Sequence, residues 1–167
     1  METRLYSTSD VGKILGKSTR FVIDWTERGL FVADVQPASG PGIKRLFSYY
    51  GVLAAAIALA IKEKLELPRS IIQGFKDYIC QDYLTIIEDP KQLAEANKWK
   101  RGFLNNLKYA MTFAIYRMGS GFKFHYSSQK IEDLMREEKL TEGTELVIYV
   151  DLSIIKGKVD KKIAQLF

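Results

Sequence analysis

A segment that begins at Ser18 leaves the fewest choices for the fold of this chain, because it reads as a short helix with a clear start and stop. The Ser18 hydroxyl can cap the first turn, and Gly29 can end the helix in the left-handed conformation. Phe21, Val22 and Trp25 recur at three- and four-residue spacing, so they share one helical face. We therefore expect a helix that packs this face against a hydrophobic core.

A second short helix is expected directly upstream, over residues 9–15, where the apolar side chains again share one face. Gly16 closes this helix, and Gly16 and Lys17 form a tight connection to the next one. Two short helices joined in this way are typical of a helix-turn-helix, whose second helix enters the major groove of DNA. Residues 18–28 are thus the candidate recognition helix.

A hairpin is predicted after the candidate recognition helix, over residues 31–47. Two prolines and two glycines interrupt this stretch, and alternating residues follow them. Taken alone, such a segment with Lys44 and Arg45 is more often a solvated loop with incidental charges. Its position directly after a helix-turn-helix favours instead a wing that lays Lys44 and Arg45 along DNA phosphates.

The order of these features carries a family resemblance. The chain reads YSTSDVGKILGKSTRFVIDWTERGLF, then GPGIKRLFS, then a long apolar helix and KEKLELPRSIIQGFKDYI. Over about residues 5–79 it resembles the N-terminal domain of MerR-type winged helix-turn-helix transcriptional regulators. Ile23 and Asp24 stand where the family commonly has a basic and an aromatic residue, and no long coiled-coil helix follows the domain. The resemblance implies a winged helix-turn-helix fold and binding to double-stranded DNA.

The expected DNA-binding residues lie at both ends of the recognition helix and in the wing. They are Lys17, Ser18, Thr19, Arg20, Arg28, Lys44 and Arg45. Arg20 lies in the first turn of the helix, where a side chain can reach base edges, while Ser18 and Thr19 can bond phosphates. Asp24 would repel the DNA backbone if it faced the groove, so either its carboxylate turns toward Arg20 or Arg28, or this helix docks differently from that of the family. The resemblance assigns Trp25 to the core and not to the DNA.

The rest of the chain divides by its hydrophobic pattern. Ser48 can cap a helix over residues 49–64 that is apolar nearly all round and is therefore expected to be buried. A helical stripe follows over residues 70–87, and a weaker helix over residues 89–99. The expected domains are a winged helix-turn-helix DNA-binding domain over 1–68, a helical connector over 69–99 and an α+β ligand-sensing or interaction domain over 100–167.

Alternating hydrophobicity predicts three strands late in the chain, over residues 109–117, 122–126 and 145–151. Helices are expected over residues 128–138 and from Ser153, which would cap the last one. This pattern predicts a small α+β unit with an antiparallel sheet, and the α+β class for the whole chain. We expect its aromatic residues to line a pocket for a small-molecule effector or an interface with a protein partner.

Composition excludes several classes of function. The chain has 167 residues with one cysteine and one histidine, and Cys80 and His125 alone cannot build a zinc site. No cofactor motif and no pairing of a nucleophile with a base is present, so we expect neither a cofactor nor an enzyme. The longest apolar run, residues 52–61, is too short to cross a bilayer, and no secretory signal precedes it. We therefore expect a cytoplasmic protein.

The net charge of +5 suits a polyanionic partner. The charge is +2 over residues 1–68 and +3 over residues 69–167, and we expect the four C-terminal lysines to be solvated. We expect a homodimeric transcription regulator, because two such domains usually share one duplex. An excisionase-like architectural DNA-binding protein, or a protein-interaction module that has lost DNA binding, stays open. RNA binding is a weak alternative, since residues 119–126 only faintly echo an RNA-recognition strand, and an enzyme is the least supported class.

Overall fold

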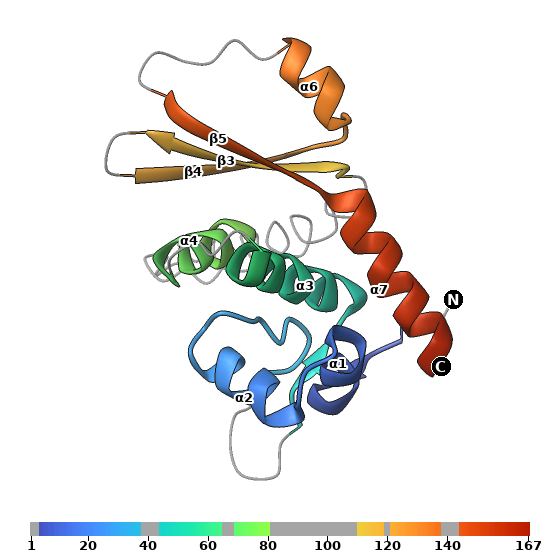
Figure 1. Cartoon of the computed structure of the whole chain (residues 1–167). Helices are drawn as coiled ribbons and strands as arrows, with labels where there is room; N and C mark the ends of the chain where they lie inside the picture. Colours follow the sequence, from blue (N-terminus) through green and yellow to red (C-terminus); the bar gives the residue numbers. More distant parts are fainter. Residues whose placement is uncertain (1–3, 38–43, 65–68, 81–109, 119–120, 138–143) are drawn as a thin grey trace, which may run out of the picture. The chain divides into compact units, whose positions relative to one another are not determined.

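The computed structural model describes residues 4–37, 44–64, 69–80, 110–118, 121–137 and 144–167. Within these ranges the chain forms six helices and two small antiparallel sheets, which confirms the expected α+β class (Figure 1). No helix in this described part is long and apolar enough to cross a membrane. Contacts between residues divide the chain into a first unit, Met1–Ile79 with Ile155–Phe167, and a second unit, Cys80–Ile154.

The first helix of the first unit begins with a capping box. The Ser7 hydroxyl, just before α1 (Thr8–Leu15), accepts a hydrogen bond from the Asp10 backbone N–H at 3.3 Å. The Asp10 carboxylate accepts in return from the Ser7 backbone N–H at 2.9 Å. Burial raises the pKa of Asp10, but the hydrogen bonds from Ser7 outweigh it and hold that pKa below its usual value. Gly16 ends the helix at a φ of +67°, as the sequence predicts.

The second helix, α2 (Thr19–Glu27), lies where the hydrophobic pattern places it. The Ser18 Oγ accepts from the Phe21 backbone N–H at 3.1 Å, so Ser18 is the predicted cap. The connection from α1 is tight, because the Lys17 backbone N–H donates to the Gly12 carbonyl at 2.8 Å. A Cβ atom at Gly12 would lie 2.8 Å from the Lys17 carbonyl oxygen, so this close approach requires glycine.

The small sheet of the first unit joins its first residues to the segment before the third helix. β1 (Tyr6–Ser7) pairs antiparallel with β2 (Leu46–Phe47). Gln36 forms an isolated antiparallel bridge with the first residue of β2, which closes the intervening loop at its base. The hairpin predicted over residues 31–47 is therefore paired at its base, and its tip, residues 38–43, lies outside the described residues.

α3 (Tyr49–Lys64) is buried nearly all round, as expected from its apolar sequence. The side chains of Val52, Leu53, Ile57 and Ile61 are fully buried. α4 (Arg69–Cys80) follows it and forms the described part of the helix predicted over residues 70–87. The helix predicted over residues 89–99 lies outside the described residues.

The start of α3 is tied to the segment that follows α2. The Ser48 Oγ accepts from the Tyr50 and Gly51 backbone N–H groups at 3.1 and 3.2 Å, which confirms Ser48 as the cap. The Ser48 backbone N–H and hydroxyl donate to the Asp34 carboxylate at 2.9 and 2.5 Å. A Cβ atom at Gly51 would overlap the Asp34 carboxylate, so this arrangement depends on glycine at the third position of α3.

The second unit contains the three predicted strands, with the first of them in the centre. The sheet order is β4-β3-β5, formed by β3 (Thr112–Met118), β4 (Gly121–Ser127) and β5 (Thr144–Asp151). Phe113 and Ile115 of β3 are fully buried, and the Phe113 ring stacks on Phe124 with centroids 5.9 Å apart. α6 (Ile131–Glu137) buries Leu134, in agreement with the helix predicted over residues 128–138.

The last helix, α7 (Leu152–Leu166), continues directly from β5. Asp151 caps it, because its Oδ1 accepts from the backbone N–H and the hydroxyl of Ser153 at 2.8 and 2.5 Å. The expectation that Ser153 caps this helix is therefore wrong, since Ser153 is the donor. From Ile155 onward the helix belongs to the first unit, whereas the sequence pattern groups residues 100–167 together.

Contacts with α3 and β1 hold α7 in the first unit. The Tyr49 hydroxyl donates to the Asp160 Oδ1 at 2.8 Å. Burial of Tyr49, together with this bond, raises the pKa of its hydroxyl well above the usual value, so the hydroxyl stays a donor. Directly after the helix, the Phe167 ring centroid lies 3.6 Å from the Arg4 guanidinium carbon. The Phe167 and Tyr6 rings form an edge-to-face pair with their centroids 6.1 Å apart.

Candidate nucleic-acid interface

The first turn of α2 is open to solvent. Ser18, Thr19 and Arg20 are exposed, and among the described residues no ion pair or hydrogen bond engages the Arg20 guanidinium. The first backbone bond of the helix runs from the Val22 N–H to the Ser18 carbonyl at 3.2 Å, and the Phe21 N–H is taken by the Ser18 Oγ. The backbone N–H groups of Thr19 and Arg20 have no acceptor in the part of the chain that the structure describes, as is usual in the first turn of a helix. This turn therefore offers a free cation beside free donors, which suits an anionic partner.

An aromatic cluster anchors the other side of α2. The Phe21 and Trp25 rings stack with centroids 4.7 Å apart, and the Trp25 and Phe31 rings lie 5.0 Å apart. Val22 and Phe31 are buried, while Phe21 and Trp25 are half-buried. Trp25 thus packs within the fold, as expected, and the cluster fixes the helix so that its first turn remains in solvent.

Lys17, expected to contact DNA, is engaged with α3. Its Nζ lies 2.5 Å from the Glu63 Oε1 and 5.5 Å from the centroid of the Phe21 ring. Its side chain is only 28% exposed, against 46% for that of Glu63. A partly exposed pair of this kind contributes little to stability, so a phosphate can take the place of Glu63.

Arg28, also expected to contact DNA, is paired within its own helix end. Its Nε lies 2.9 Å from the Asp24 Oδ1, one helical turn earlier. The Asp24 carboxylate therefore turns toward Arg28, which is one of the two arrangements that relieve its repulsion from a DNA backbone. The Arg28 carbonyl also accepts from the Arg69 Nη2 at 3.2 Å, which ties the end of α2 to α4.

The two cations expected in the wing lie in different surroundings. The Arg45 Nη2 is 3.1 Å from the Glu27 Oε1, and the Arg45 side chain is only 19% exposed. Lys44 is exposed, and no ion pair among the described residues includes it. Arg45 therefore fastens the segment before β2 to the end of α2, while Lys44 is the cation that points into solvent.

Reasoning from the sequence missed the acidic partners of these cations. Glu63 is 46 residues from Lys17 and Glu27 is 18 residues from Arg45, so no local spacing marks either pair. The Asp24–Arg28 pair has the four-residue spacing that a helix requires, and the sequence could reveal it. Asp34 was also missed, because its role at the start of α3 depends on a contact across 14 residues.

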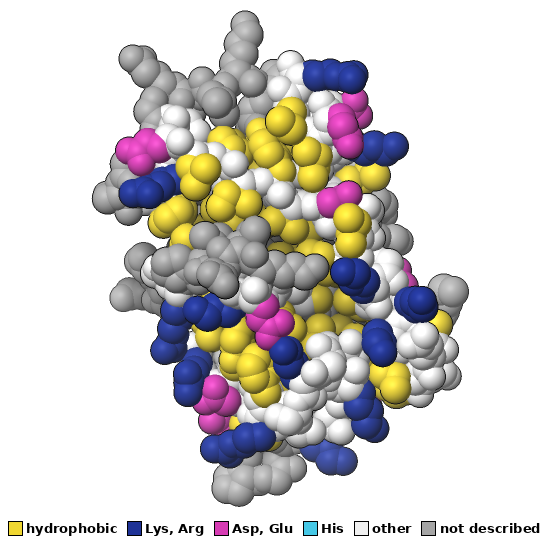
Figure 2. Space-filling model, in the orientation of Figure 1, with side chains coloured by type: hydrophobic (Ala, Val, Ile, Leu, Met, Phe, Trp, Pro, Cys, Tyr) yellow, Lys and Arg dark blue, Asp and Glu magenta, His cyan; other side chains and the backbone are white. Residues whose placement is uncertain are grey.

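Grouping the residues by unit changes the distribution of charge. Residues 1–79 and 155–167 carry 15 Lys and Arg against 9 Asp and Glu, a net charge of +6. Residues 80–154 carry 10 against 11, a net charge of −1. The positive charge is therefore concentrated in the first unit, because the four lysines of α7 join it. Figure 2 shows Lys and Arg side chains spread over the elements of this unit, with fewer Asp and Glu among them.

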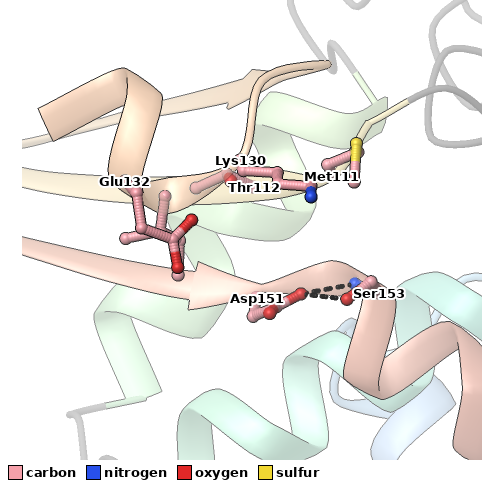
Figure 3. A pocket seen from close by; sticks show the side chains of 7 residues that line it. Met111, Thr112, Lys130, Glu132, Asp151 and Ser153 are labelled. Atoms are coloured by element: carbon pink, nitrogen blue, oxygen red, sulfur yellow. Dashed lines mark hydrogen bonds between the residues drawn. The ribbon is translucent and has the colours of Figure 1, made fainter. Parts of the chain in front are cut away.

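A small pocket of about 280 Å³ lies in the second unit. Its lining residues are Met111, Thr112, Lys130, Ile131, Glu132, Asp151 and Ser153. Figure 3 shows the side chains of Lys130, Glu132 and Asp151 around the same space. The hydrogen bond from the Ser153 hydroxyl holds the pKa of Asp151 below its usual value, so this carboxylate is charged at neutral pH. The volume and the charged lining suit a small polar molecule.

Comparison with known proteins gives no further guide to the site. No model of a protein family matches the chain, and a search of curated proteins finds no similar sequence. Among the described residues, no three His, Cys, Asp or Glu side chains lie together in a way that could hold a metal ion.

Proposed function

We propose that this protein binds double-stranded DNA in a sequence-specific manner and acts as a transcription regulator. The observation that carries the proposal is the first turn of α2, where Arg20 is exposed and, like the neighbouring backbone N–H groups, has no bonding partner among the described residues. In this proposal α1 and α2 form a helix-turn-helix, and α2 enters the major groove with its first turn toward the bases. Arg20 then bonds a guanine edge, where a bidentate arginine discriminates between bases.

The other residues of the interface position the protein on the duplex. Ser18 and Thr19 contact phosphates at the start of α2, where the partial positive charge of the helix favours an anion. Lys44 contacts the flanking backbone from the loop before β2, which serves as the wing. Lys17 and Arg28 exchange their exposed carboxylate partners for phosphates, at little loss of stability. Arg45 acts mainly by holding the wing against α2.

The sequence resemblance to MerR-type regulators over about residues 5–79 supports this assignment. It leads us to propose a cytoplasmic homodimer that places two α2 helices on one duplex. The second unit is the proposed sensing or docking domain. Its pocket is the proposed place for a small polar effector, because Asp151 and Ser153 belong both to the pocket lining and to the start of α7.

Selection from a pool of random duplexes tests the proposal, followed by fluorescence anisotropy with the enriched duplex and an unrelated one. We expect enrichment of a short site and affinity that falls steeply with salt, as phosphate contacts require. Lys44→Gln should lower the magnitude of the salt slope by about 1, whereas Lys123→Gln in the second unit should leave it unchanged. No enrichment, with binding no tighter than that of an equally basic unrelated protein, would contradict the proposal.

A further inference from the structure

α7 carries a stripe of three exposed lysines. Lys161 and Lys162 follow Lys158 by three and four residues, so the side chains of both lie next to that of Lys158 on one side of the helix. None of the three forms an ion pair or hydrogen bond with another residue in the described part of the chain. Like charges at these spacings weaken a helix when nothing neutralises them. The lysine stripe therefore costs the isolated protein stability and fits a surface that meets an anionic partner.

The acidic residue of α7 does not offset this stripe. Asp160 points toward the first unit, where its carboxylate accepts the hydrogen bond from Tyr49 at 2.8 Å. Val159, on the packed side, is only 4% exposed. Because Val159 is buried and Asp160 bonds Tyr49 of α3, whereas all three lysines are exposed, the lysine stripe lies on the solvent side of the helix. Figure 2 shows Lys and Arg side chains along this helix.

The stripe belongs to the same unit as α2, so it can meet the same partner. Phe167, the residue after α7, contacts Tyr6 of β1, and from Tyr6 the chain reaches α2 through α1 and a three-residue connection. α1 is about 12 Å long and its connection to α2 spans at most about 14 Å, so the path from Tyr6 to the start of α2 is at most on the order of one turn of DNA, about 34 Å. A duplex that binds α2 thus extends at least this far from it.

We infer that Lys158, Lys161 and Lys162 form a second, sequence-independent contact with the phosphate backbone of the duplex that α2 reads. This inference rests on the proposed function, and it adds a region more than 110 residues away from the recognition helix to the DNA-binding surface. The net charge of +6 on the first unit favours DNA over the alternatives. A membrane surface fits less well, because an interfacial helix needs a continuous exposed apolar side, whereas the exposed large apolar side chains of α7, Ile154 and Leu166, lie near opposite ends of the helix.

Two triple variants of the full chain test the inference. Lys158→Gln/Lys161→Gln/Lys162→Gln removes the stripe, and Arg117→Gln/Lys123→Gln/Arg136→Gln removes the same charge from exposed positions of the second unit that lie outside its pocket. We expect the stripe variant to lower the magnitude of the salt slope by about 2–3, one unit for each lost phosphate contact, while the control variant matches wild type. Affinity should fall at least about tenfold on selected and unrelated duplexes alike, so the specificity ratio should stay unchanged.

The outcomes separate this inference from the proposed function. If wild-type protein binds no duplex, both the proposed function and the inference on α7 are overturned. If wild-type protein binds and Arg20→Ala relaxes specificity while the stripe variant behaves like the control, only the inference on α7 is overturned. Vesicles of phosphatidylcholine with phosphatidylserine serve as a further probe. Stripe-dependent binding to these vesicles without any effect of the stripe on the duplex salt slope would assign the lysines to a membrane and overturn the inference.

Discussion

Individual cations of the first unit divide into two groups by their partners. Lys17, Arg28 and Arg45 each lie within 3.1 Å of a carboxylate oxygen. Arg20, in contrast, is exposed and has no ion pair among the described residues. An unpaired arginine loses no protein contact when it bonds a base or a phosphate, whereas a paired one must first give up its carboxylate. Arg20 should therefore contribute the most to recognition.

The Asp24–Arg28 pair offers a test of which end of α2 approaches DNA. Because the pair is exposed, Asp24→Asn should change the free energy of unfolding by no more than about 0.5 kcal/mol. Affinity should rise by the same factor on selected and unrelated duplexes, since one repulsive charge is lost and Arg28 is freed for a phosphate. Anisotropy titrations measure both. If Asp24→Asn and Arg28→Gln both leave affinity unchanged, the end of α2 lies away from the DNA.

Gly51 and Gly157 are both helical glycines of the first unit, so an alanine at Gly51 tests the packing there and an alanine at Gly157 serves as its control. Gly51→Ala should lower the free energy of unfolding by about 2–4 kcal/mol, because the new methyl group displaces the Asp34 carboxylate from Ser48. Gly157→Ala in α7 should raise it by up to about 1 kcal/mol, because a Cβ there has no atom within 4 Å and alanine favours the helix. Urea unfolding measures both. Equal effects of the two substitutions would contradict the role given to Asp34.

At the scale of helices and strands, the sequence predicts where an element begins and ends better than it predicts which element it packs against. The sequence could predict the Ser18 cap of α2, the end of α1 at Gly16 and the strand around Phe113. These features depend on hydrogen bonds and side-chain directions among residues that are close together in the chain. The partner of α7 could not be predicted from its pattern. Its apolar side requires a surface to pack on, but the contact that selects the first unit joins Tyr49 to Asp160 across 111 residues. Glu63 could not be predicted as the partner of Lys17 for the same reason, because the two residues are 46 positions apart.

The start of α7 should respond to acid. The hydrogen bond from the Ser153 hydroxyl lowers the pKa of Asp151 from its usual value of 3.8. The folded form thus holds this proton less tightly than the unfolded chain does, so Asp151 stabilises the fold above about pH 4, and this contribution is lost as the pH falls through the folded-state pKa. Urea unfolding between about pH 5 and pH 2 should show a weaker pH dependence for Asp151→Asn than for wild type. Identical pH dependence in the two proteins would contradict this role for Asp151.

The whole molecule combines a basic unit with a nearly neutral one. The first unit carries a net charge of +6 and the second −1, although a division of the sequence at residue 68 gives almost equal charges. Because the last segment of the chain returns to the first unit, the positive charge of this unit draws on both ends of the sequence. α7 follows β5 directly along the chain, so the segment that leaves the pocket-bearing second unit continues into the basic first unit.

Self-association is expected for the intact protein. In the proposed function one α2 helix would read only a short half-site, so two copies on one duplex would be needed for the specificity of a regulator. Sedimentation velocity at micromolar concentration should therefore show a species of twice the 19.1 kDa chain, at least when the selected duplex is present. A single monomeric species both with and without DNA would contradict this expectation and would favour a protein that acts on DNA as a single copy.

The specificity ratio of Arg20→Ala tests the central claim most directly. Fluorescence anisotropy gives the affinity for the selected duplex and for an unrelated one at the same salt concentration. We predict that the substitution costs about 1–3 kcal/mol on the selected duplex and clearly less on the unrelated one, because a base contact is lost in one complex and only a phosphate contact in the other. Lys123→Ala in the second unit should leave both affinities unchanged. An unchanged ratio for Arg20→Ala, with wild-type protein binding both duplexes equally, would contradict sequence-specific recognition through α2.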